Sequence, residues 1–198
     1  MTEIFGRFDF DVIARWIREG ERVLDLGCGD GSLLKFLQVE KGIRGYGVEN
    51  DPGNVLAAIR NGVNVLQFDL EQGLQGFDDD SFDHVIMSLS LQTVRHTVPL
   101  VQEMLRVGHE AVVSFPNFGH RSHREAIARG RMPVSEALPY QWYDSPNVRF
   151  FTIADFEALC ADNGIVVHEG LFFDEGRAVT DDPNLNADVA LYRLGRQP

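Results

Sequence analysis

The chain has 198 residues, 44% of them hydrophobic and 24% charged, which suits one domain with a sizeable core over residues 1–198 and leaves no comfortable room for a second. Its 30 acidic residues against 18 lysines and arginines give a net charge of −12, which argues against nucleic acid or an anionic membrane as a partner. Two cysteines without disulfide or metal-knuckle spacing, no apolar run of the roughly 20 residues that span a bilayer, and no leader pattern in residues 1–6 together predict a cytoplasmic protein.

Short apolar runs alternate with helical patterns from residue 21 onward, which is typical of a parallel sheet with crossover helices. The expected helices are 10–17, 32–39, 51–61, 98–107 and 152–163, the last with Thr152 as N-cap and Gly164 as its stop. The expected strands are 22–26, 44–48, 63–67, 82–88, 110–115, 165–173 and 187–193. Five parallel strands and a closing antiparallel pair, joined by a surface loop at 174–186, predict an α/β, doubly wound, mostly parallel seven-stranded sheet.

Residues 116–150, which we call the cover segment, follow the fifth expected strand and show no clean period. They hold four of the eight prolines and several aromatic residues, including Trp142 and Tyr143. Long irregular connections in compact domains are usually functional or disordered, and the aromatic content argues against disorder. We therefore expect a functional cover, whose aromatic residues serve either as packing for a lid or as a patch for a protein partner.

A glycine loop follows the first expected strand, with Asp25, Gly27, Cys28, Gly29 and Gly31 as candidate binding residues. Three glycines remove β-carbons where the backbone turns tightly and approaches a ligand, before a helix begins at Ser32. The ordinary alternative is a glycine-rich turn without a ligand. Cys28 is expected to be a small packing residue, although a helix N-terminus can lower a thiol pKa.

Acidic residues stand at or just after the ends of the second and third expected strands. Glu49 can accept hydrogen bonds from both ribose hydroxyls of a nucleoside, and Asp69 can accept one from an adenine amine, although a turn or capping role is the ordinary explanation for an aspartate there. Their neighbours Asn50 and Leu70 and the fourth-strand residue Ser88 complete the predicted site.

The spacing of the glycines bears on which nucleoside is bound. A dinucleotide site also pairs a glycine loop with an acidic strand end, but its fingerprint is G-x-G-x-x-G, whereas this loop reads G-x-G-x-G. Residues 23–31 and Glu49 resemble the first two motifs of class I S-adenosylmethionine-dependent methyltransferases. The resemblance implies S-adenosylmethionine or S-adenosylhomocysteine as ligand, and a dinucleotide-dependent oxidoreductase is the competitor.

Longer blocks narrow the resemblance. They lie at 103–108, 114–120, 130–135 and 138–144, and they are similar to the signature blocks of the MetW family of bacterial methionine-biosynthesis proteins. This resemblance covers almost the whole chain and implies a methyltransferase-like domain that works beside homoserine O-acyltransferase. Position 121 departs from the family pattern, because arginine stands where an aromatic residue is expected.

The sequence leaves catalysis open, because methyl transfer needs chiefly alignment and a base only for a protonated acceptor. Candidate bases in the cover segment are His120, His123, Tyr140 and Asp144, each with an ordinary structural explanation, and no Cys or His cluster predicts a metal. A free-standing methyltransferase acting on a small metabolite is the alternative to the acyltransferase partner. A further hypothesis is that the chain reports the level of S-adenosylmethionine to the acyltransferase.

Overall fold

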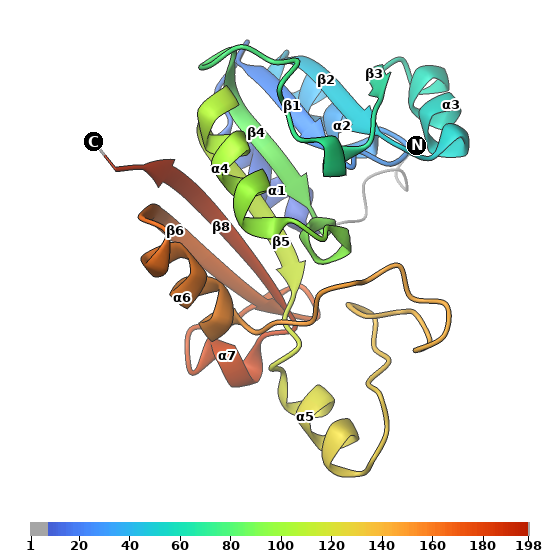
Figure 1. Ribbon diagram of the computed structural model, residues 1–198, viewed down its shortest axis with the longest axis vertical. Helices are drawn as coiled ribbons and strands as arrows, with labels where there is room; N and C mark the ends of the chain where they lie inside the picture. Colours follow the sequence, from blue (N-terminus) through green and yellow to red (C-terminus); the bar gives the residue numbers. More distant parts are fainter. Residues whose placement is uncertain (1–7, 198) are drawn as a thin grey trace.

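One mixed sheet forms the centre of the molecule in the computed structural model, which describes residues 8–197 (Figure 1). Residues 1–6, where a leader pattern was sought, lie outside the described residues. The strand order is β3-β2-β1-β4-β5-β8-β6-β7. The strands are β1 (Arg22–Leu26), β2 (Arg44–Glu49), β3 (Asn64–Gln67), β4 (Phe82–Ser88), β5 (Gly108–Pro116), β6 (Ile165–Asp174), β7 (Arg177–Ala178) and β8 (Val189–Arg196).

The pairing confirms the predicted α/β sheet. Strands β1 to β5 pair in parallel, and β8 then joins β5 and β6 in antiparallel fashion. The sheet has one strand more than expected, because the predicted loop 174–186 contains β7 and the short helix α7 (Pro183–Asn186). A tight turn through Glu175 and Gly176, both with positive φ, folds β7 back onto β6.

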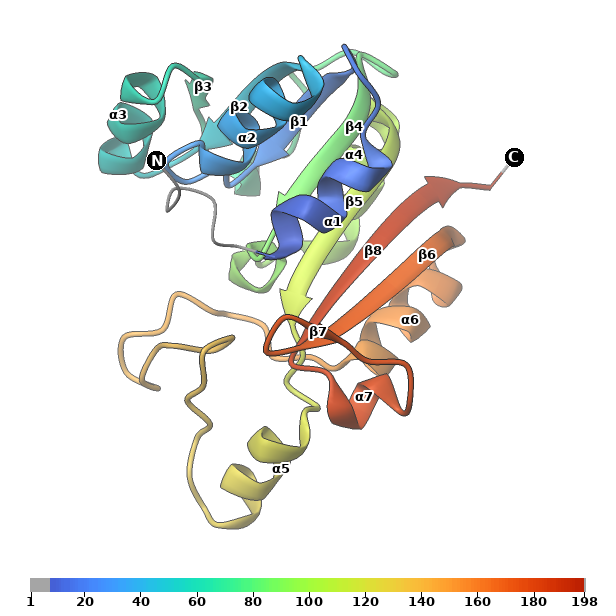
Figure 2. The same cartoon turned by 180° about the vertical axis from the view of Figure 1, so that it is seen from behind.

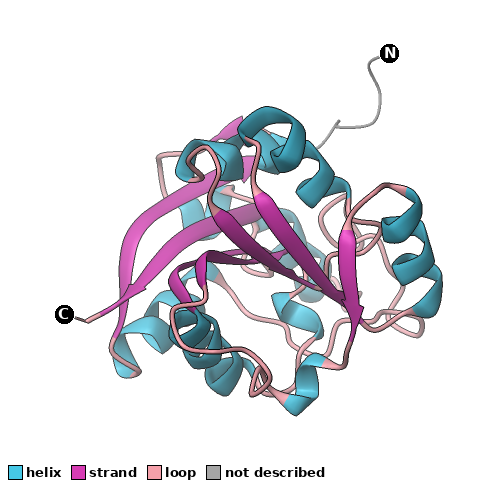
Figure 3. Ribbon diagram, turned by 90° about the horizontal axis from the view of Figure 1, so that it is seen from above, coloured by secondary structure: helices cyan, strands magenta, loops and turns pink. Residues whose placement is uncertain are grey.

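Helices cover both faces of the sheet, as Figures 1 and 2 show from opposite sides and Figure 3 from above. The buried side chains of α1 (Phe8–Trp16), α2 (Ser32–Lys41) and α3 (Pro52–Arg60) pack in one apolar cluster. Those of α4 (Thr97–Val107) and α6 (Ile153–Asp162) pack in the other, against the opposite face. This arrangement confirms the doubly wound fold and leaves the carboxyl ends of the parallel strands open for a ligand.

Local sequence signals explain where α6 begins and ends. Thr152 and Asp155 form a capping box, in which each side chain binds a backbone N–H at the helix start. Gly164, directly after the C-cap, adopts the left-handed conformation with φ 65°, which a residue without a β-carbon adopts at little cost. Both predicted signals are confirmed.

The cover segment stands off the sheet at its carboxyl edge, toward which the arrowheads of β4 and β5 point (Figure 1). It begins with a helix that the sequence pattern did not reveal, α5 (Arg121–Ala128), and then runs without regular helix or strand to Phe150. Two further single-turn helices, η1 (Leu70–Gln72) and η2 (Leu91–Thr93), follow β3 and β4. No helix within residues 8–197 is both long and apolar enough to cross a membrane.

Candidate functional site

The glycine turn leaves β1 at Leu26 and is tied to the end of β2. The N–H groups of Gly27 and Cys28 both donate to the carbonyl oxygen of Val48, at 2.8 and 3.1 Å. Gly27, Gly29 and Gly31 have φ of 70°, 56° and 76°, a region that residues with a β-carbon rarely adopt. The predicted glycines are therefore required by the backbone of the turn itself.

The three glycines differ in what surrounds them. A β-carbon at Gly27 would lie 3.2 Å from the side chain of Ser90, and one at Gly31 would lie 3.0 Å from Val63. A β-carbon at Gly29 would meet nothing within 4 Å. Gly27 and Gly31 thus permit close packing within the protein, whereas Gly29 borders open space.

Glu49 connects the end of β2 to the glycine turn. Its Oε2 accepts a hydrogen bond from the Gly29 N–H at 2.9 Å, and its Oε1 accepts from the N–H groups of Asn50 and Asp51 at 2.8 and 2.9 Å. A carboxylate offers about four acceptor positions, so these three bonds leave about one for a ligand. The same side chain therefore fixes the turn and presents an oxygen at the crevice.

Two hollows meet at Gly27 and together form the crevice at the carboxyl ends of β1 to β4. The first, of about 190 Å³, is lined by Gly27, Val48, Glu49, Asn50, Phe68, Asp69, Leu70, Glu71, Thr93 and Val94. The second, of about 120 Å³, is lined by Phe10, Asp25, Gly27, Cys28, Gly29, Asp30, Ser32, Leu33 and Ser88. Nine of the ten predicted residues line one or the other, and Gly31 lines neither.

Asp69 and Cys28 each have a structural role as well as a place at the crevice. Asp69 caps η1, because its Oδ1 accepts a hydrogen bond from the Glu71 N–H at 3.0 Å. Burial raises the pKa of the Cys28 thiol, and the nearby carboxylates of Asp25 and Glu49 raise it further. The lowered thiol pKa that a helix N-terminus can cause is therefore not found, and Cys28 is a neutral packing residue.

Two features beside the crevice were not predicted from the sequence. Asp9 of α1 is buried and accepts a hydrogen bond from the Ser88 hydroxyl at 3.0 Å, so the first helix contributes a carboxylate at the end of β4. Leu89, the next residue, has φ 51° and is held there by hydrogen bonds from its N–H to Ser114. An acidic residue between apolar helix positions was the one available signal for Asp9, and nothing in the sequence marks Leu89.

The four candidate bases lie in the cover segment, and none of them lines either hollow. His123 is buried between the Asn117 carbonyl oxygen and the Ser135 hydroxyl, at 3.1 and 2.9 Å, and burial lowers its pKa. His120 faces Asp174 at 3.3 Å. Among residues 8–197, no group of three or more His, Cys, Asp or Glu side chains is placed to hold a metal ion.

Comparisons with known proteins agree with this geometry. The family model described as "Methionine biosynthesis protein MetW" matches residues 7–194. The bifunctional methionine biosynthesis protein MetXA/MetW of Rhodopirellula baltica is 39% identical over 210 residues, which span 99% of this chain and 34% of that protein. The chain therefore covers about a third of the length of the curated relative that it matches.

Solved structures show the same fold at low sequence identity. An S-adenosylmethionine-dependent methyltransferase from Mesorhizobium loti matches with a TM-score of 0.72 and 20% identity over 98% of this chain and all of that one. Another from Archaeoglobus fulgidus matches with a TM-score of 0.69 and 17% identity over 96% of this chain and 94% of that one. The predicted class I methyltransferase-like fold is confirmed.

Proposed function

The chain belongs to the MetW family of methionine biosynthesis proteins, and from this premise we propose that it binds S-adenosylmethionine or S-adenosylhomocysteine and works in the cytoplasm beside a homoserine O-acyltransferase. One observation carries the nucleoside part of the proposal. Carboxylates from the ends of two neighbouring strands, Glu49 and Asp69, line one hollow that reaches the glycine turn. Open parallel sheets bind nucleosides at this edge.

The residues around the crevice suit the parts of such a ligand. Glu49 would accept from the ribose at its remaining position, and a second ribose hydroxyl would compete with the Gly29 N–H that Glu49 now binds. Asp69 would accept from the adenine amine in the same hollow. Asp25, 2% exposed and lining the second hollow, would accept from the ammonium of the amino-acid part, directly or through water.

The partner in the proposal rests on the family and on the fused relative. In the Rhodopirellula baltica protein, one polypeptide carries both names, MetXA and MetW, and this chain matches a third of it. We take the MetXA part to be the acyltransferase that the family resemblance implies. Covalent fusion keeps two activities at a high effective concentration, which supports a working contact between the same two units where they are separate chains.

Calorimetric titration of the purified chain tests the ligand. We expect S-adenosylmethionine and S-adenosylhomocysteine to bind more tightly than NAD, and we expect Glu49→Gln to weaken both by at least tenfold, because a neutral amide loses a charge-assisted hydrogen bond of about 1.5–3 kcal/mol. Glu40→Gln, an exposed position on α2, is the matched control and should bind as the unchanged chain does. Preference for NAD would instead favour the oxidoreductase.

Co-purification tests the partner. The chain and the acyltransferase of the same organism should co-elute, and acyl transfer should depend on adding the chain. Independent elution with unchanged acyl transfer would contradict the partnership. Conversion of S-adenosylmethionine to S-adenosylhomocysteine on addition of a metabolite pool would favour the free-standing methyltransferase instead. An acyl-transfer rate that changes with S-adenosylmethionine would support the reporting role.

A further inference from the structure

Half of the exposed large hydrophobic side chains lie in one short stretch of the cover segment. Fourteen such side chains are found in the described chain, and seven of them fall within residues 132–150, a tenth of its length. Trp142 and Tyr143 are the most exposed, at 74% and 71%. Single exposed apolar residues are ordinary, but a cluster of aromatic ones at a protein surface marks an interaction site.

Residues 132–150, which we call the aromatic stretch, are held in place at both ends, so their exposure does not come from a loose loop. At the start, the Ser135 hydroxyl contacts the buried His123 ring at 2.9 Å and accepts from the Leu138 N–H at 3.1 Å, and Leu138 itself is buried. At the end, the N–H groups of Val148 and Arg149 both donate to the carbonyl oxygen of Gln92 at 3.0 Å. The chain thus presents a fixed aromatic surface, which lowers the entropy cost of binding.

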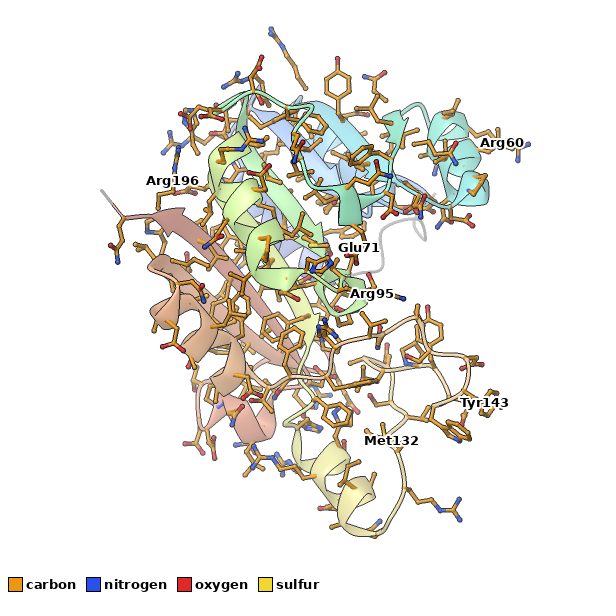
Figure 4. The ribbon with its side chains drawn as sticks, in the orientation of Figure 1. Arg60, Glu71, Arg95, Met132, Tyr143 and Arg196 are labelled. Atoms are coloured by element: carbon orange, nitrogen blue, oxygen red, sulfur yellow. The ribbon has the colours of Figure 1, made fainter. Side chains whose placement is uncertain are left out.

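The exposed aromatic rings pack against neighbouring aromatic rings. Trp142 and Tyr143 meet edge to face with ring centroids 5.6 Å apart, and Phe150 packs on Phe118 at 5.1 Å. Figure 4 shows Tyr143 at the outer edge of the segment, directed away from the sheet. Tryptophan, tyrosine and arginine are the residues that contribute most energy at protein interfaces.

A groove of about 420 Å³ opens beside the aromatic stretch, between α4 and α6, and Phe150 belongs to both. Its walls include the apolar residues Val98, Phe156 and Leu159, and they carry charges of both signs, from Arg95, Arg149 and Asp155. The groove lies next to the crevice, where the Arg95 N–H donates to Glu71 at 2.7 Å (Figure 4). An apolar hollow beside exposed aromatic anchors suits a side chain from a partner.

Either a second copy of this chain or a different protein could cover this surface. The cover segment carries a net charge of +2 and the remainder of the chain −14, but four of its five arginines precede residue 132, and within residues 140–150 Arg149 is balanced by Asp144. In a symmetric dimer through this surface, identical side chains would face each other only near the two-fold axis, so charge does not decide against a second copy. A second copy docking through its acidic part would repeat head to tail, which forms open chains unless the rotation closes. The exposed aromatic side chains fit an apolar recess of a different protein, and the relative that carries the names MetXA and MetW in one polypeptide favours the acyltransferase as that protein.

We propose that the exposed aromatic residues 140–150, together with the groove between α4 and α6, form the surface on which the acyltransferase docks. This inference rests on the proposed function for the identity of the partner. The aromatic rings enter an apolar recess of that enzyme, and the charged side chains of the groove, Arg95, Arg149 and Asp155, face groups of opposite sign at its rim. Trp142 and Tyr143 do not line the nucleoside crevice, so the contact that these two residues make with the partner lies outside the crevice.

Binding of the full-length chain to the acyltransferase, measured by surface plasmon resonance, tests the surface with matched variants. Trp142→Ala and Tyr143→Ala should each weaken binding by at least tenfold, with unchanged melting temperature and unchanged calorimetric affinity for S-adenosylmethionine. The control is Tyr46→Ala, which removes another exposed tyrosine, 45% exposed on β2, and should bind as the unchanged chain does. Arg131→Glu, in the exposed basic part of the cover segment, should slow association and reduce its dependence on salt.

The outcomes separate this inference from the proposed function. If the unchanged chain binds the acyltransferase and Trp142→Ala and Tyr143→Ala bind equally well, the surface is wrong and the partnership stands. If the unchanged chain does not bind at all, both fail. If Tyr143→Ala abolishes self-association in sedimentation experiments while acyltransferase binding is kept, the occupant is a second copy and the inference is overturned.

Discussion

Adding one methyl group at Gly29 tests whether a ligand lies against the glycine turn, because Gly29 has a close match elsewhere in the chain. Gly29 and Gly20 both have positive φ, at 56° and 74°, and a β-carbon built on either meets nothing within 4 Å. Gly20 lies in the turn before β1, at the end of the strand opposite to the crevice. The two alanine variants therefore share a backbone cost and differ in what the methyl group faces.

The shared cost follows from the backbone. A left-handed residue with a β-carbon costs about 1–2 kcal/mol, and the stiffer unfolded chain offsets about 0.4–1 kcal/mol of it. The net loss of about 1 kcal/mol should lower the melting temperature of a chain of this size by about 2–4 °C in either variant.

The binding effect should appear in Gly29→Ala alone. A ligand displaced by the new methyl group loses at least one hydrogen bond to a charged group, worth about 1.5–3 kcal/mol, which corresponds to about 10- to 150-fold in affinity. Calorimetry with S-adenosylhomocysteine measures it, and differential scanning calorimetry checks that both variants lose similar stability. A Gly29→Ala variant that binds within twofold of Gly20→Ala would refute the placing of the ligand.

Three further predictions concern stability. Gly47→Ala should cost about 1–3 kcal/mol, because the new β-carbon would lie 2.4 Å from the Cys28 sulfur. Cys28→Ala should recover part of that cost in a double-mutant cycle followed by urea unfolding, and additive effects would contradict the contact. Asn117→Ala should cost about 2–4 kcal/mol in the same assay, because the buried amide donates to the Ala187 carbonyl oxygen at 2.7 Å and accepts from the Gly119 N–H at 2.9 Å. A loss below about 1 kcal/mol would show that water replaces these hydrogen bonds. Burial lowers the pKa of His123 below its ordinary 6.5, so the unfolded chain takes up a proton first as the pH drops, and the free energy of unfolding should fall between pH 6.5 and the pKa of the folded state. His123→Gln should therefore reduce the difference between the urea midpoints at pH 7.5 and pH 5.5. An unchanged difference would assign the pH dependence to other groups.

The parts of the fold that a local pattern specifies were predictable. Each of the seven expected strands is present, because β-branched and apolar runs bounded by turn residues have few alternatives in an α/β chain. The hairpin of β7 was not predictable, since a strand of two residues has no period and forms only because β6 runs on to Asp174 beside it. Helix α5 was missed for a related reason: His123 is its one buried residue, so it shows no apolar stripe.

The candidate site divides in the same way. Positions fixed by chain order, such as Gly27 and Glu49 at the ends of adjoining strands, follow from the rule for open parallel sheets, and the structure brings them to one crevice. The contact of Asp9 with Ser88 joins residues 79 positions apart, and it depends on how α1 lies across the sheet. Tertiary packing sets the angle of α1 on the sheet, and the spacing of residues in the sequence does not predict that angle.

The crevice and the proposed docking surface meet at the segment that follows β4. Thr93 of η2 lines the crevice, and the adjacent Gln92 carbonyl oxygen holds the end of the aromatic stretch through Val148 and Arg149. A ligand that shifts η2 would therefore also shift the end of the cover segment, and linkage requires that a partner bound there change ligand affinity by the factor by which the ligand changes the affinity for the partner. Variants at Gln92 would disturb both sites at once. Gly29 and Trp142 lie at opposite ends of this connection, so their variants report on one site each.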